Sequence, residues 1–398
     1  MAIWLIVLFS VIDVKALLAL LRQADCIIPI LFFALAVLGT LWAQSPWSER
    51  LHGINPVSKL LVIPLLIYQF ERSSRGLWVV VAFLASCTLL LAFSFVVLFA
   101  PWLKISVTLG DGVPVKNYID QSQEFALCMV ALASPALTFA SDRKWRLALA
   151  CLALILAFFA NMMFVVSART ALVYTPVLLV LFAVRHLRAR TAALLLTGVA
   201  VLTVAVWFTS PYLRERVSHI PVEYQGYEHN EITSTAQRLG FWVRSLKFIV
   251  QAPLFGHGTG STRILFEQDA AGKTGLAADV VSNPHNQTLN VAVQWGFLGV
   301  LVLYAMWIAH LRMFGVKSLA AFAGSLVVVQ NMVSSLLNSH LFDFHEGWMY
   351  VLGVGVTGGM VLRAKHMSTG PQLLDGSARE LSPNFGDGRA GQAEAVTG

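Results

Sequence analysis

Charged residues are scarce in this sequence. Asp, Glu, Lys and Arg make up only 12% of its 398 residues, whereas 57% are hydrophobic and the mean hydropathy is +0.70. About a quarter of the residues of a typical soluble domain are charged, so this composition excludes such a domain and indicates a polytopic membrane protein. The net charge of +7 then reflects membrane topology. No nucleic-acid partner is implied, because binding one needs a basic surface outside the lipid.

Signatures of disulfide-rich and nucleotide-binding proteins are also missing. The four cysteines, at 26, 87, 128 and 151, lie in or beside apolar segments, so no disulfide framework occurs in the exported loops. FGHGTGST, residues 255–262, has spaced glycines but neither a Gly-Lys-Ser/Thr sequence nor a Rossmann third glycine, which argues against a nucleotide site. We expect a tight turn there, with cradling of an anion as the alternative.

Long apolar runs dominate what is present. A helix needs about 20 apolar residues to cross a bilayer. Runs near this length occur at roughly 2–21, 27–43, 57–70, 76–100, 122–140, 146–166, 170–186, 191–209, 287–309, 318–337 and 347–362. The first contains Asp13 and Lys15 but lacks the features of a cleaved signal peptide, so we expect a retained helix. The runs predict an all-α, polytopic integral membrane protein with about 11 (10–12) transmembrane helices.

Loop charges predict the orientation, because Lys and Arg of short loops are retained in the cytoplasm. Basic residues recur in every second loop, at 72–75, 143–146, 185–190, 312–317 and 363–365. The long segment 210–284 falls on the opposite, periplasmic side. We therefore expect N-terminal transmembrane helices at 1–209, a periplasmic loop with an amphipathic helix at 210–284, C-terminal transmembrane helices at 285–365 and a disordered cytoplasmic tail at 366–398.

The large loop contains one amphipathic helix. TSTAQRLGFWVRSLKFIVQAP predicts a helix from near Ser234 to just before Pro253. Its apolar stripe at helical spacing predicts that it lies along the membrane surface or the protein body. The stripe consists of Leu239, Trp242, Val243, Leu246, Ile249 and Val250. Arg244 projects away from this stripe, whereas Arg238 borders it and is either an interfacial anchor or an anion clamp.

A histidine stands at the start of a long apolar helix, in SNPHNQTLNVAVQWG. Asn283 is a good N-cap and Pro284 suits the first helical position, so His285 is predicted at the second. A helix N-terminus attracts anions and disfavours protonation of imidazole. His285 is therefore a candidate general base beside a bound phosphate; the alternative is a histidine that only caps the helix or sits at the interface.

Two further polar groups are expected on the same face. Arg169, in SART, stands between two apolar runs, where a charge is costly and marks either function or a buried ion pair. NSHLFDFHEGW supplies His340, Asp343, His345 and Glu346, which lack firm metal-ligand spacing. We expect this segment to contact an acceptor or to orient His285.

Together these motifs resemble one family. His285, Asn286, Leu289 and Gly296 match a His-Asn-x-x-Leu-x6-Gly signature, and the arginines of SART and QRLGFW and the segment APLFGHGTGS precede it in the expected order. On this basis residues of roughly 25–365 resemble the O-antigen ligase and O-antigen polymerase superfamily of bacterial membrane glycosyltransferases, and most closely an O-antigen ligase.

The resemblance implies a reaction. A glycan would pass from undecaprenyl pyrophosphate to a hydroxyl of the lipid A-core, or of another glycan acceptor, at the periplasmic side of the bacterial inner membrane, in lipopolysaccharide biosynthesis. His285 would activate the hydroxyl or assist departure of the donor, Arg169 and Arg238 would hold the pyrophosphate, and Asn286, Asp343 and His345 would support them. No cofactor or metal is expected, and inversion at the anomeric carbon is the family-based expectation.

Other functions remain open at this point. An O-antigen or exopolysaccharide polymerase, or a transferase acting on proteins, would show the same motif. A transporter or flippase of lipid-linked glycans would share the topology, but its polar groups should lie on broken helices near the bilayer midplane. The position of His285, Arg169 and Arg238 in space is the discriminator, because a transferase should bring them to one cavity.

Overall fold

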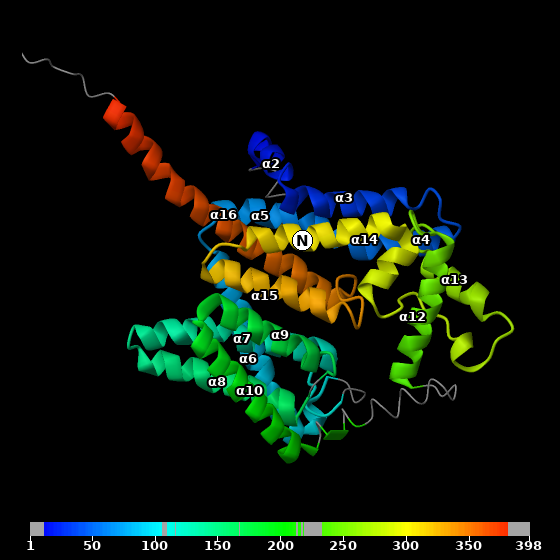
Figure 1. Ribbon diagram of the computed structural model, residues 1–398, viewed down its shortest axis with the longest axis horizontal. Coiled ribbons are helices and arrows are strands. Elements are labelled where there is room, and N and C mark those ends of the chain that lie inside the picture. The colour runs from blue at the N-terminus through cyan, green and yellow to red at the C-terminus, as the bar shows by residue number, and fades with distance from the viewer. Residues whose placement is uncertain are drawn as a thin grey trace, which may run out of the picture.

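Helices provide all the regular structure that the computed structural model describes (Figure 1). The described residues are 12–105, 110–115, 117–166, 168–211, 214–215, 218 and 233–380, with backbone alone for 369–380. No strand occurs among these residues. The predicted all-α, polytopic class is confirmed.

The helices up to residue 209 are α2 (Val14–Leu21), α3 (Ala24–Leu38), α4 (Trp47–Ser58), η1 (Lys59–Leu61), α5 (Val62–Arg72), α6 (Gly76–Phe99), η2 (Pro101–Leu103), α7 (Tyr118–Ser141), α8 (Trp145–Phe164), α9 (Ala171–His186) and α10 (Ala189–Thr209). Those that follow are α12 (Ser234–Gln251), α13 (Ser261–Ala270), η3 (Gly275–Ala278), α14 (Gln287–Met313), α15 (Leu319–Ser334) and α16 (Phe344–Glu380). Asp13, which interrupts the first apolar run, caps α2: its carboxylate accepts hydrogen bonds from the backbone N–H groups of Lys15 and Ala16. Residues 1–11 of that run lie outside the described part.

Fewer helices than predicted are long and apolar enough to cross a bilayer. Among the described residues six qualify, or seven if α2 and α3, which are bent by 80°, form one span. The sequence-based number of about 11 is higher because it counts apolar runs. Some runs are longer than the helix that forms within them, and some form helices too short to cross the bilayer. Both α9 and α15 have 16 residues. At 1.5 Å per residue each is about 24 Å long, shorter than a hydrocarbon core of about 30 Å.

The core is formed by long helices that pack side by side. Contacts are most extensive between α5 and α16, between α7 and α8, between α15 and α16, and between α3 and α14. Trp295, Trp307, Tyr174 and Tyr350 are among the largest side chains fully buried there. This packing holds the first turn of α14 in a fixed position against its neighbours.

Helix α14 is broken at Gly296, which has φ +59° and ψ −153°. A Cβ atom at this position would lie 2.4 Å from the carbonyl carbon of Leu254, so only glycine fits. The N–H groups freed by the break donate to the chain: Phe297 to the carbonyl of Pro253 and Leu298 to that of Leu254. The glycine of the His-Asn-x-x-Leu-x6-Gly signature therefore lets the loop after α12 dock against the broken helix.

A lobe outside the helical bundle contains α12, α13 and η3. Its small core consists of Phe241, Phe248, Phe266 and Val293. Only part of the predicted apolar stripe of α12 faces this core: Trp242 and Ile249 pack against it, whereas Val243, Leu246 and Val250 are exposed. The buried face carries aromatic residues and Arg244, which is only 8% exposed. Arg244 thus lies opposite the exposed residues of the stripe, and buried acceptors described below satisfy its guanidinium group.

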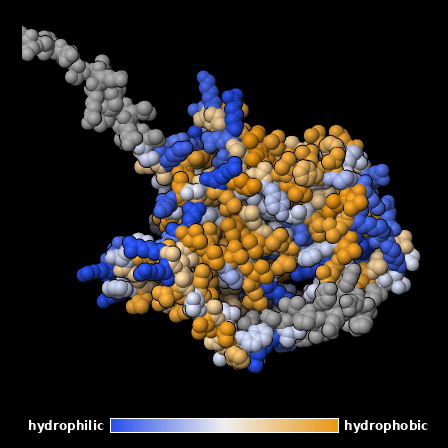
Figure 2. Space-filling model, viewed as in Figure 1, coloured by the Kyte–Doolittle hydropathy of each residue, from blue (hydrophilic) through white to orange (hydrophobic). Residues whose placement is uncertain are grey.

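The bundle has two polar ends separated by an apolar band (Figure 2). At one, the basic end, Arg363 donates to the carbonyl of Arg72, and Arg185 donates to the carbonyls of Phe314 and Val316. At the other, the lobe end, lie α4, α12 and α13 (Figure 1). Helix α16 extends to Glu380, beyond residue 366 where the sequence predicts an unstructured tail, and 381–398 lie outside the described residues.

Candidate functional site

The candidate base precedes its helix instead of belonging to it. The N-cap of α14 is Asn286, whose side-chain oxygen accepts a hydrogen bond from the N–H of Leu289 at 3.0 Å. His285 has φ +54°, a left-handed conformation that is uncommon for a residue with a side chain. Asn283, the predicted cap, instead accepts the backbone N–H of His285 at 2.9 Å. The prediction that His285 is the second helical residue is wrong: the helix begins three residues later than predicted, because Asn286 and not Asn283 caps it.

A chain of hydrogen bonds fixes the imidazole. Nδ1 of His285 lies 2.8 Å from the side-chain oxygen of Asn338, and the amide nitrogen of Asn338 donates to Asp343 at 2.9 Å. Because the carboxylate holds the amide in this orientation, Asn338 presents its oxygen to His285, and Nδ1 carries the proton. Nε2 is then the basic nitrogen.

The surroundings of His285 favour its neutral form. Burial lowers its pKa below the ordinary value, the hydrogen bond to Asn338 raises it, and the positive charge of Arg238 lowers it; the net shift is downward. The ring stacks on Phe241 with centroids 6.2 Å apart, and Trp242 donates to the carbonyl of Pro284 at 3.1 Å. Helix α12 therefore supplies both the wall and the charge beside the imidazole.

Both predicted arginine ligands lie near the first turn of α12. Arg238 is partly buried on this helix, close enough to His285 to influence its pKa. Arg169, just before α9, reaches the hydroxyl of Thr235 at 3.5 Å, although the two are 66 residues apart in sequence. Since Thr235 and Arg238 are three residues apart on a helix, they lie on neighbouring positions of one face. The fold thus gathers His285, Arg238 and Arg169 around one helix end.

The three predicted supporting residues have different positions. Asn286 caps α14 and donates to the carbonyl of Leu336 at 2.9 Å. Asp343 reaches His285 through Asn338, as described above. His345 is turned toward α7, where its Nδ1 lies 2.9 Å from the carboxylate of Asp120. Of the three, Asp343 has the most direct connection to the imidazole.

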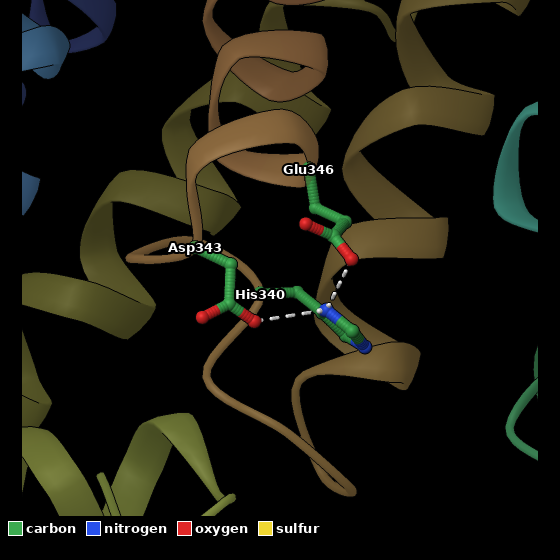
Figure 3. A group of neighbouring side chains, drawn as sticks. All are labelled: His340, Asp343 and Glu346. Atoms are coloured by element: carbon green, nitrogen blue, oxygen red, sulfur yellow. Dashed lines mark ion pairs between the residues drawn. The ribbon is translucent and has the colours of Figure 1, made fainter. Parts of the chain in front are cut away.

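A buried ionic cluster supports this segment (Figure 3). Nδ1 of His340 lies 3.2 Å from Glu346 and 3.4 Å from Asp343. Burial lowers the pKa of His340, but the hydrogen bonds to both carboxyl groups raise it, and the net shift is upward. The ammonium group of Lys59 donates to the backbone carbonyls of Phe342 and Asp343. Protonated His340 and Lys59 together balance the two carboxylates.

These side chains are also of the types that hold metals. Ligand atoms of His340, Asp343 and Glu346 all lie within 4.8 Å of one another, so the trio could hold a divalent cation. The nearby ammonium group of Lys59 makes such an ion less favourable electrostatically. The charge balance described above already explains the cluster, and metal-independent chemistry remains our prediction.

Two adjoining cavities lie beside His285. The larger, of about 460 Å³, is lined by His285 together with Val280, Val281, Ser282, Asn283 and Arg263. The smaller, of about 220 Å³, shares Ser282, Asn283 and Arg263 and extends to α4 and Asp343. Neither Arg169 nor Arg238 lines either cavity.

The glycine-rich segment builds a turn rather than an anion cradle. Gly256, Gly258 and Gly260 all have positive φ. The N–H groups of residues 257 and 258 donate to carbonyls of α14, and that of Gly260 donates to the side chain of Gln294 at 2.9 Å. These donors are occupied by the protein, which supports the expectation of a tight turn and argues against anion binding there.

Comparison with known families decides the assignment. The family model described as O-antigen ligase matches residues 152–304. The chain carries a domain of the O-antigen ligase superfamily. This confirms, over residues 152–304, the resemblance to the superfamily drawn from the motifs. No curated protein matches the chain.

The O-antigen ligase match covers only part of the site. It includes Arg169, Arg238 and His285 but ends before Asn338 and Asp343. Sequence reasoning considered Asp343 and missed Asn338 and Lys59. Asn338 is the first residue of the polar segment NSHLFDFHEGW, and its amide, next to the other polar residues, could have identified it as a partner for His285. Lys59 could also have been identified, because it is a single cation inside an apolar run and a buried charge requires a partner.

Proposed function

We propose that the chain is an O-antigen ligase of the bacterial inner membrane. It transfers a glycan from undecaprenyl pyrophosphate to a hydroxyl of the lipid A-core oligosaccharide on the periplasmic side, with inversion at the anomeric carbon and without a metal. The family match supports the superfamily. The site geometry supports the finer assignment of roles.

One observation carries this proposal: the imidazole of His285, whose pKa is lowered by burial, lies near Arg238, while Arg169 contacts the same end of α12 through Thr235. Cleavage of a glycosyl diphosphate produces a leaving group with several negative charges. Two guanidinium groups can stabilise such a group in the transition state, and each offers a planar fork that matches phosphate oxygens. The site therefore combines a base with an anion-stabilising region.

In the proposed reaction His285 is the base, and Asn338 and Asp343 hold it in position. Nε2 of His285 accepts the proton of the acceptor hydroxyl as the oxygen attacks the anomeric carbon. The bond between that carbon and the phosphate oxygen breaks, and undecaprenyl pyrophosphate leaves with its electron pair. Asn338 holds the proton on Nδ1 of His285, and Asp343 holds Asn338 in place. This arrangement keeps the basic nitrogen available.

The transporter alternative loses its main structural argument. A transporter uses the unpaired peptide groups of broken helices to bind its cargo. Helix α14 is broken at Gly296, but the N–H groups of Phe297 and Leu298 are bonded to the loop at residues 253–254. His285, Arg238 and Arg169, which carry the proposal, instead precede the start of α14 in the chain.

The polymerase alternative shares the same site and must be separated by experiment. Purified protein is reconstituted with an undecaprenyl pyrophosphate-linked glycan and rough lipopolysaccharide, and products are resolved by mass. A ligase attaches one donor chain to each lipopolysaccharide molecule. Growth of the lipid-linked glycan itself, with unmodified lipopolysaccharide, would show a polymerase.

A further inference from the structure

The smaller cavity described above has the chemistry of a sugar site. Its floor is formed by Asn290 and Gln294, one turn apart on α14 and only 4% and 5% exposed. Thr262 from the first turn of α13 joins them, with its hydroxyl 3.4 Å from the side-chain oxygen of Asn290. These side chains are held by the protein: Gln294 donates to Asn290 at 3.0 Å and accepts from the N–H of Gly260, and Asn290 donates to Ser339. The second lone pair of the Gln294 oxygen and the hydroxyl oxygen of Thr262 remain as oriented acceptors for a sugar hydroxyl.

The walls of this cavity do not suit a phosphate. Two carboxylates line it, those of Glu49 and Asp343, against one guanidinium group. That group, Arg263, already pairs with Glu267 at 2.9 Å and lies 3.9 Å from Glu49. An anion would therefore meet a net negative lining, whereas carboxylates accept hydrogen bonds from sugar hydroxyls.

The volume of about 220 Å³ limits the occupant. Pockets for drug-sized molecules measure about 300–1,000 Å³, so this one suits a single small ring. It adjoins the larger cavity, which His285 lines, and the two share the lining residues Arg263, Ser282 and Asn283. A ring seated there could present a hydroxyl to the imidazole.

The identity of the ring follows from the positions of the charges. Direct displacement brings the nucleophile to the face of the anomeric carbon opposite the leaving group. If the diphosphate lies with Arg169 and Arg238, which line neither cavity, the nucleophile must come from elsewhere around His285. We propose that the smaller cavity binds the acceptor, as an uncharged sugar ring whose hydroxyl attacks. This inference rests on the proposed function.

The test measures the two substrates separately. Glu49→Gln removes a charged acceptor from the cavity, and Ser282→Trp adds a bulky side chain at a residue that lines both cavities. Glu49→Gln should raise the KM for rough lipopolysaccharide by about tenfold, the effect of losing one hydrogen bond to a charged group. Ser282→Trp should raise the same KM by steric exclusion, and both should leave the KM for the lipid-linked donor unchanged. Glu267→Gln is the matched control, because Glu267 also pairs with Arg263 but does not line the cavity.

The outcomes are distinct. An unchanged acceptor KM for Glu49→Gln, a change confined to the donor KM, or an equal effect of Glu267→Gln would overturn the inference. If the wild-type protein transfers nothing, the proposed function fails, and binding of purified core oligosaccharide is then measured by saturation-transfer NMR. Binding to the wild type that Glu49→Gln weakens would still support a sugar site, and equal binding to both proteins would refute it.

Discussion

Two arginines six residues apart on α12 occupy opposite kinds of environment. Arg244 is buried in the lobe, where it donates to Asp269 at 2.8 Å, to the carbonyl of Phe266 at 2.9 Å and to that of Asp279, with its guanidinium group over the ring of Phe266. Arg238 is partly buried beside His285, at the edge of the lobe. The same side chain thus serves as a structural element at one position and as a candidate ligand at the other.

The comparison shows how to separate structural from functional charge in this chain. Around Arg244 the acceptors come from the lobe itself, and Asp269 binds Lys247 and Lys273 as well. The hydrogen bond from Lys247, together with that from Lys273, lowers the pKa of Asp269 to about 2. The imidazole of His285 is bonded to Asn338 through Nδ1, and His285 lines a cavity. Loss of the first network should cost stability, whereas loss of the second should cost activity.

The largest expected effect is that of His285→Ala. Without a base, transfer in the reconstituted assay should fall by about 10²–10⁴-fold, the usual contribution of general-base catalysis. The melting temperature should match that of the wild type. His366→Ala, at the basic end, is the control and should retain full transfer; normal transfer by His285→Ala would remove the catalytic assignment.

Arg244→Met should have the next largest effect, on stability. Removing one partner of a buried ion pair is costly, so the free energy of unfolding should fall by about 3 kcal/mol. The loss is not larger because Lys247 and Lys273 still compensate the charge of Asp269. Lys247→Met removes an exposed partner of the same carboxylate and should cost less than about 1 kcal/mol. Denaturation in detergent measures both, and equal losses would show that burial of Arg244 adds nothing.

Replacing Arg238 or Arg169 with Lys should have an intermediate effect on transfer. A point charge does not reproduce the guanidinium fork, so kcat/KM for the donor should fall by roughly 10–100-fold. Arg75→Lys at the basic end is the control. Donor affinity and turnover equal to those of the wild type in both variants would argue against diphosphate binding at α12.

The smallest effect concerns pH. The neutral imidazole is the active form, so kcat/KM should fall as the pH drops through the lowered pKa of His285, with a midpoint below the ordinary histidine value of 6.5. Arg238→Gln removes a neighbouring positive charge and should move this midpoint upward. A wild-type midpoint above 6.5 would contradict the environment described for the imidazole.

Sequence patterns predicted the elements that depend on composition and spacing. The helical class follows from apolar runs. His285 was selected because it stands at the start of an apolar helix, Arg238 because it borders an apolar stripe, and Arg169 because a charge between two apolar runs is costly. Their meeting near α12 could only be proposed, since 66 residues separate Arg169 from Thr235.

The errors arose where tertiary contacts override local preference. Asn286 replaced Asn283 as the cap of α14, and Asn283 was available to bond His285 and Ser339. The burial of Arg244 was not predicted, because its acceptors come from α13 and the end of η3. The break at Gly296 depends on a loop that docks from another part of the chain, which no helical periodicity reveals.

The most direct test of the central claim is a structure of the protein with bound undecaprenyl pyrophosphate. We predict that its diphosphate oxygens lie within about 3 Å of the guanidinium groups of Arg238 and Arg169, next to the imidazole of His285. A diphosphate that contacts neither arginine would contradict the proposed site.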